Sequence, residues 1–213
     1  MKKALKIFMV VIIFIPHIDS YAQTFGIKGG LNLSDLLLKD NTQTYNSDMI
    51  TGIHIGATVG IPLSGESIIF EPGIFFNMKG SKDTEGGYSE TLSLNYLDIP
   101  LNLKAVFGSD KIKGYGALGP YIGVGISGKD KWSSTSGNDS GSETIEWGND
   151  ADNDLLKRLD FGIGIGAGVI FGNVSAGVSY NLGLANISSD TSDGMKVKNK
   201  VLQISIGYLF GKK

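Results

Sequence analysis

The feature that most constrains this chain is an alternation of apolar with small or polar residues, which returns eight times. In one segment Leu159, Phe161 and Ile163 alternate with glycines at 162, 164, 166 and 168. A period of two places all the apolar side chains on one face of a β-strand. The pattern predicts strands at residues 25–33, 52–62, 68–79, 96–107, 114–128, 158–171, 174–184 and 202–210.

The length of these segments and their connections point to a membrane protein. Each segment has about ten residues, which a tilted strand needs to cross a bilayer. The connections at 64–66, 108–111 and 172–173 are short turns, whereas the alternate connections are long and polar. This asymmetry is typical of outer-membrane barrels and places both chain ends on the periplasmic side. The sequence therefore predicts an all-β fold, an eight-stranded antiparallel up-and-down transmembrane β-barrel.

Aromatic residues support this prediction. They fall at the short-turn ends of the apolar faces, as an interfacial belt requires. The belt comprises Phe25, Phe70, Phe107, Phe171, Tyr208 and Phe210.

A soluble β-sandwich or a lipocalin-like barrel is the alternative, because strands in those folds also alternate. Their outward faces would be rich in lysine and glutamate. Here the face opposite the apolar one is mainly glycine, serine, asparagine and tyrosine. Such side chains suit the narrow interior of an eight-stranded barrel, which is filled and leaves no aqueous channel.

The first 22 residues have the pattern of a secretory signal peptide. Three lysines precede the apolar segment 7–15, and Ser20-Tyr21-Ala22 offers small residues at both recognition positions of a signal peptidase. The apolar segment is shorter than the ~20 residues of a membrane anchor. We expect cleavage before Gln23, export to the outer membrane, and one barrel domain over residues 23–213.

Composition argues against several kinds of site. The chain has no cysteine, so disulfides, thiolate metal sites and a lipoprotein anchor are not expected. A formal net charge of −2 does not fit a nucleic-acid binder. The acidic segment 150–154 lacks the glycine and the bidentate glutamate of an EF-hand, which leaves a loose surface calcium site or a solvated loop. We expect no cofactor and no metal-ligating residues.

Seven titratable residues are expected to point into the lumen: Lys28, His54, Glu71, Asp98, Lys104, Arg158 and Asp160. In a narrow interior they should pair, since an unpaired buried charge is costly. They predict a plug of salt bridges and hydrogen bonds. Catalysis by His54 is the alternative, because some eight-stranded barrels are lipid-modifying enzymes. In the sequence no serine or aspartate stands out as its partner, and such an enzyme needs a site at the lipid-facing rim. We expect no enzymatic activity.

The predicted external loop 129–157 is acidic and contains both tryptophans of the chain. It has seven acidic and three basic residues, together with Trp132 and Trp147. Exposed aromatic residues in a polar loop can be binding contacts, whereas a loop rich in glycine, serine, asparagine and aspartate is often disordered. The sequence leaves both interpretations open.

Three motifs resemble the PorT family of outer-membrane β-barrel proteins of Bacteroidota. They are Gln23-Thr24-Phe25-Gly26-Ile27-Lys28-Gly29-Gly30-Leu31-Asn32-Leu33-Ser34, the segment from Glu71-Pro72-Gly73-Ile74 to Lys79-Gly80, and the segment from Tyr96-Leu97-Asp98-Ile99-Pro100-Leu101 to Lys104. The resemblance extends over nearly all of residues 23–213. It implies an integral outer-membrane barrel with Lys28, Glu71, Asp98 and Lys104 in the lumen. The founding member is linked to type IX secretion, but the motifs do not imply that role for this chain.

We therefore expect a monomeric protein in contact with outer-membrane lipid, with a filled lumen, long external loops and a structural or surface-interaction role. An accessory role in an envelope or type IX secretion complex, with envelope proteins as partners, is the first alternative. An outer-membrane lipid-modifying enzyme is the second.

Overall fold

The computed structural model describes residues 23–64, 67–109, 111–134 and 139–211. The predicted signal peptide, residues 1–22, lies outside the described residues. The elements in chain order are β1 (Thr24–Lys39), β2 (Thr44–Asn46), β3 (Ile50–Ser64), β4 (Ile68–Glu85), β5 (Tyr88–Gly108), β6 (Ile112–Ser134), β7 (Ser140–Thr144), β8 (Leu159–Phe171), β9 (Val174–Gly183), the 3₁₀-helix η1 (Ser192–Gly194) and β10 (Lys196–Phe210). No helix in these ranges is long and apolar enough to cross a bilayer.

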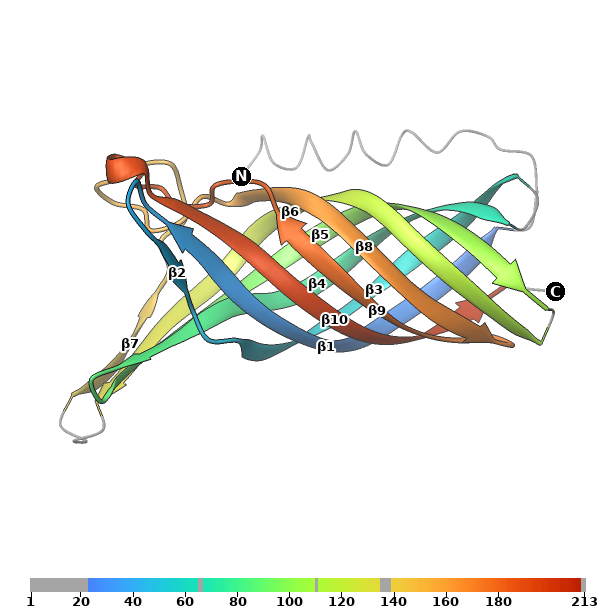
Figure 1. Cartoon of the computed structure of the whole chain (residues 1–213), viewed down its shortest axis with the longest axis horizontal. Helices are drawn as coiled ribbons and strands as arrows, with labels where there is room; N and C mark the ends of the chain where they lie inside the picture. The colour runs from blue at the N-terminus through green and yellow to red at the C-terminus, as the bar shows by residue number, and fades with distance from the viewer. Residues whose placement is uncertain (1–22, 65–66, 110, 135–138, 212–213) are drawn as a thin grey trace.

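Eight long strands close into a ring (Figure 1). Each pairs antiparallel with its neighbours, in the order β1-β3-β4-β5-β6-β8-β9-β10, and β10 returns to β1. The closing register runs from Phe25 opposite Phe210 to Lys39 opposite Lys196. The short strands β2 and β7 pair with the ends of β1 and β6. The predicted all-β, eight-stranded antiparallel barrel is confirmed.

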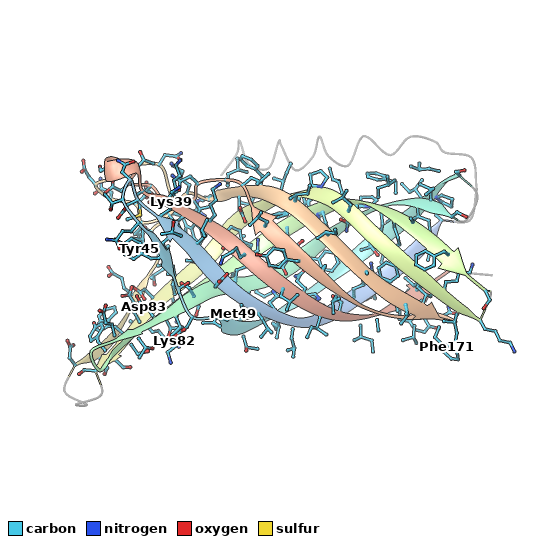
Figure 2. All side chains as sticks on the ribbon, in the orientation of Figure 1. Lys39, Tyr45, Met49, Lys82, Asp83 and Phe171 are labelled. Carbon is cyan, nitrogen blue, oxygen red and sulfur yellow. The ribbon has the colours of Figure 1, made fainter. Side chains whose placement is uncertain are left out.

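The outer face of the barrel is apolar. Ile27, Ile55 and Ile165 are exposed on three different strands. Five of the six residues predicted for the aromatic belt are also exposed, and Phe70 is half-buried. Figure 2 shows Phe171 near the short-turn end of the barrel, whereas Lys82 and Asp83 lie at the other end. In water this much apolar surface would be unfavourable, so its natural surroundings are lipid.

The two ends of the barrel differ, as the sequence predicted, but two predicted long loops are wrong. In the predicted loop 129–157, β6 continues to Ser134 and β7 occupies Ser140–Thr144. The segment between the third and fourth predicted strands is instead a continuation of β4 and β5 that ends in a tight turn at Gly86-Gly87. Both glycines have positive φ, +58° and +82°, which is the conformation that a two-residue hairpin turn of the I′ type requires. This hairpin and the β6–β7 hairpin project beyond the barrel (Figure 1).

Apolar side chains fill the lumen at the long-loop end. The strands supply Leu36, Leu94, Tyr96 and Val197, and the loops supply Ile145, Trp147, Leu156, Ala185 and Ile187. We name these nine residues the apolar plug. At the short-turn end Ile170 and Leu209 are also buried. The polar part of the lumen therefore lies between two apolar layers.

Candidate functional site

Two lysines share one carboxylate in the half of the lumen nearer the short turns. Glu71 on β4 accepts hydrogen bonds through Oε1 from Lys28 on β1 and through Oε2 from Lys104 on β5. The side chains of Lys104 and Glu71 are 4% and 6% exposed. The Lys104 ammonium also lies 4.6 Å from the ring centroid of Tyr115, within cation–π range. We name Lys28, Glu71 and Lys104 the lysine-rich triad.

A second triad has the opposite composition and lies beneath the apolar plug. The Nζ of Lys79 lies 2.9 Å from Oδ2 of Asp98 and 3.2 Å from Oδ2 of Asp160. The same oxygen of Asp160 accepts hydrogen bonds from the Tyr121 hydroxyl and the Asn199 amide. We name Lys79, Asp98 and Asp160 the aspartate-rich triad. Because each of its charges has a partner, the desolvation cost of burial is partly offset.

A neutral hydrogen-bond network separates the two triads. The Asn32 amide nitrogen donates to the carbonyl of Met78 at 2.9 Å, so its Oδ1 is an acceptor. That oxygen lies 2.7 Å from Nδ1 of His54, which must therefore carry the proton. In the neutral ring Nε2 is then an acceptor, and it receives the hydroxyl of Ser205 at 2.9 Å. Gln203 and Asn77 extend the network toward the aspartate-rich triad.

Six of the seven predicted lumen residues belong to this interior: Lys28, His54, Glu71, Asp98, Lys104 and Asp160. The prediction for Arg158 is wrong. It precedes β8, is exposed, and donates from Nη1 to the carbonyl of Gly125 at 3.2 Å. The inward alternation of β8 begins at Asp160. The sequence interpretation also left out Lys79, although it occupies the same strand face as Glu71 and Asn77.

The sequence did not reveal the serine partner of His54. Gly30 on β1 is opposite both His54 on β3 and Ser205 on β10. A Cβ on Gly30 would lie 3.0 Å from Cε1 of His54 and 1.9 Å from the carbonyl oxygen of Ile204. Because Gly30 has no side chain, the imidazole of His54 can reach across β1 to Ser205. Because closure of the barrel brings β1 beside β10, a pair 151 residues apart becomes adjacent.

A cavity of about 110 Å³ opens beside these groups. Its lining includes Lys28, Lys104, Tyr115, His54 and Ser205. It therefore joins the lysine-rich triad to the neutral network. A space of this size, lined by both polar and apolar side chains, accommodates several water molecules or one small ligand.

The two tryptophans differ in their surroundings. Trp132 lies on β6 and is half-buried, and its indole packs over Gly141 of β7. Trp147 is 9% exposed and belongs to the apolar plug, so the interpretation of Trp147 as an exposed binding contact is wrong. A Cβ on Gly125 would lie 2.3 Å from its ring, which shows how closely the indole approaches the β6 backbone.

The carboxylates of Asp150 and Asp154 in the acidic segment 150–154 accept hydrogen bonds from groups of the same segment. Asp150 accepts from the Asn153 side chain at 2.8 Å and from the Asp152 amide at 3.1 Å, and these hydrogen bonds lower the pKa of its carboxyl. The Oδ2 of Asp154 accepts the amide of Asp150. Among the described residues no group of three or more histidine, aspartate or glutamate side chains could hold a metal ion.

The comparison with protein families agrees with this architecture. Residues 21–189 match the family described as the outer membrane protein beta-barrel domain. The chain belongs to this family. It is an outer-membrane β-barrel protein, with the filled interior described above. Comparison with curated protein sequences gives no match.

Three solved structures have a similar fold. Ail, the attachment invasion locus protein of Yersinia pestis, is 17% identical over 89% of this chain and 100% of its own, with a TM-score of 0.41. Neisserial surface protein A is 12% identical over 86% and 96%, with a TM-score of 0.44. The outer membrane enzyme PagL is 16% identical over 88% and 99%, with a TM-score of 0.42. These likenesses concern the fold alone.

Proposed function

We propose that this outer-membrane barrel is a non-enzymatic, non-conducting protein with a structural and surface-interaction role, and that its projecting β-sheet makes the contacts. The observation that carries the proposal is the combination of a blocked lumen with strands that continue beyond the barrel. A blocked lumen leaves no path for solutes, whereas the continued strands form a rigid surface outside the lipid.

The lumen is blocked at successive levels. The apolar plug lies at the long-loop end, and the two triads and the neutral network cross the middle of the lumen around the cavity. Tyr96, Asn32 and Asp160 are fully buried. Eight strands enclose an interior that side chains fill, so conduction would require this packing to rearrange.

The projecting sheet consists of the β4–β5 hairpin, the end of β6, and β7. The register between β5 and β6 continues to Tyr88 opposite Ser134, and β7 extends the sheet through residues 140–144. Tyr88 is 41% exposed near the hairpin turn. A paired sheet presents its side chains with little loss of conformational entropy on binding, which favours contact with another protein. We infer that the partner is a protein of the cell envelope.

Assignment to the PorT family is part of the same proposal. It is supported by the family-typical residues Lys28, Glu71 and Lys104, which form one triad. With the short turns on the periplasmic side, the projecting sheet would face the exterior. We further propose that the first 22 residues direct export and that the barrel is monomeric.

Planar-bilayer recording of the refolded protein tests the blocked lumen. We expect no steady single-channel current. Steps of uniform conductance that persist through several preparations would contradict the proposal.

A shortened hairpin tests the surface role. Residues 84–89 are replaced by Gly-Gly, which keeps the hydrogen-bonded type of pair, Asp83 opposite Glu90, beside the new turn and preserves the register of the barrel. A photo-crosslinker at position 82 should capture envelope proteins when the hairpin has its full length, and should capture none in the shortened variant. As the control for folding, both proteins should show the heat-dependent gel shift of a folded barrel. Unchanged capture by the shortened variant would show that the projecting sheet makes no such contact.

A further inference from the structure

One wall of the lumen cavity, formed by the lysine-rich triad, has an excess of positive charge and of hydrogen-bond donors. Asp98 also lines the cavity and is paired with Lys79. The lysine-rich triad has two ammonium groups and one carboxylate, which leaves one positive charge. From this arrangement we propose that the cavity binds a small oxyanion, a single phosphate or carboxylate group, between Lys28, Lys104 and Tyr115.

Charge is the first argument. Lys104 is 3% exposed as a residue and Lys28 is partly buried, so bulk water solvates their ammonium groups poorly. The compensating negative charge belongs to the aspartate-rich triad, in which Asp98 also lines the cavity but is paired with Lys79 and accepts a hydrogen bond from Asn77. A counterion beside the lysines would lower the cost of burying their charge, because Coulomb interactions are stronger in a medium of low dielectric constant.

The count of hydrogen-bond donors is the second argument. Each lysine has three N–H donors, and within the described residues Glu71 is the acceptor for one of each. The other N–H groups of Lys28, and those of Lys104 that do not face the Tyr115 ring, can donate to a ligand. An oxyanion offers several acceptor lone pairs in a small volume and forms strong, charge-assisted hydrogen bonds.

Tyr115 supplies a further donor from the opposite wall. Its ring lies beneath the Lys104 ammonium, and its hydroxyl lies over Gly177, where a Cβ would be 2.2 Å from the oxygen. The described side chains and backbone provide no hydrogen-bond partner for this hydroxyl, and the residue lines the cavity. Glycine at 177 thus leaves room for a phenol that can donate to a ligand.

The size of the cavity sets the class of ligand. A volume of about 110 Å³ is sufficient for several water molecules or one small anion. The site therefore suits inorganic phosphate or a short carboxylate.

Thermal unfolding of the full chain, refolded in maltoside micelles, tests the proposal. Sodium phosphate, sodium acetate or sodium chloride is present during refolding at equal ionic strength and pH 7. We expect phosphate or acetate to raise the unfolding midpoint relative to chloride, and the more effective anion identifies the oxyanion class. Equal midpoints in all three salts would overturn the proposal.

Variants with opposite expected effects separate binding from a general loss of stability. Glu71→Gln raises the net charge of the triad to two and should lower the phosphate concentration for half-maximal stabilisation at least several-fold. Lys28→Met removes the excess charge and should abolish the anion effect, and Tyr115→Phe should weaken it several-fold. Lys200→Met, which disrupts a separate 2.8 Å pair with Asp35, is the matched control and should keep the wild-type response. Weaker binding in Glu71→Gln, or an undiminished effect in Lys28→Met, would overturn the site.

Discussion

The rings of Tyr96 and Trp147 meet edge to face at an interplanar angle of 89°, with 5.6 Å between their centroids. Tyr96 belongs to the barrel wall on β5, whereas Trp147 belongs to the connection between β7 and β8. Edge-to-face geometry brings the positive edge of one ring to the negative face of the other. This contact fixes a polar, acidic loop onto the barrel from within.

Replacing Trp147 by alanine should loosen this end of the lumen. Loss of a buried tryptophan costs about 3–5 kcal/mol, through lost burial and the resulting cavity. We expect the urea midpoint of the refolded barrel to fall and protease cleavage within residues 139–158 to accelerate. Trp132→Ala is the matched control, because that indole is half-buried outside the plug. A similar loss of stability in both variants would show that the plug does not hold the loop.

Lys79 should be the most sensitive of the lumen lysines. Its removal as Lys79→Met leaves Asp98 and Asp160 buried without their cation, which costs about 3–5 kcal/mol. We expect loss of the folded, heat-modifiable gel band at temperatures where wild type keeps it. The triple variant that also carries Asp98→Asn and Asp160→Asn should recover much of the loss, since no buried carboxylate then lacks a partner. A triple variant no more stable than Lys79→Met would contradict this account.

The sequence predicted the barrel fold correctly, but it predicted strands that are too short. Alternation with the apolar residues outward identifies a strand where the lumen side is polar. At the long-loop end the phase reverses: Leu36, Leu94 and Val197 point inward, and outward neighbours such as Ser93 and Lys196 are polar. The predicted strands therefore end early, and the β4–β5 hairpin was interpreted as a loop although Gly86-Gly87 is a hairpin-turn signal.

The candidate site was predicted in part for a related reason. Period two assigns a residue to the inward face, and this was sufficient for Glu71 and Asp98. It does not say which inward residues meet across the lumen, because that depends on strand tilt and on closure of the ring. The contact of His54 with Ser205 arises from closure across Gly30, and Trp147 comes from a loop without periodicity.

The pair of His54 and Ser205 makes a direct test of the non-enzymatic proposal possible. A serine that donates to a histidine has the hydrogen bond of a nucleophile and its base. Here both side chains belong to the interior network, away from the lipid-facing surface. We expect no labelling of the folded protein by a fluorophosphonate probe and no effect of Ser205→Ala on the lipid profile of cells. Stoichiometric labelling that Ser205→Ala removes would establish a reactive serine and contradict the proposal.

Asp40, in the connection that follows β1, gives a prediction for acid pH. Hydrogen bonds from the backbone amides of Thr42 and Gln43, then from the Thr42 hydroxyl, lower the pKa of its carboxyl from 3.8 to about 2. A depressed pKa means that the folded loop prefers the ionised form, so the stabilisation is complete above pH 3.8 and is lost as the pH falls through about 2. Carbon-13 NMR of the refolded protein should record a midpoint near 2 for this carboxyl. Thr42→Val keeps the backbone donor but removes the hydroxyl, and should move the midpoint part of the way toward 3.8. A midpoint at 3.8 in the wild type would show that the turn around Asp40 does not form in solution.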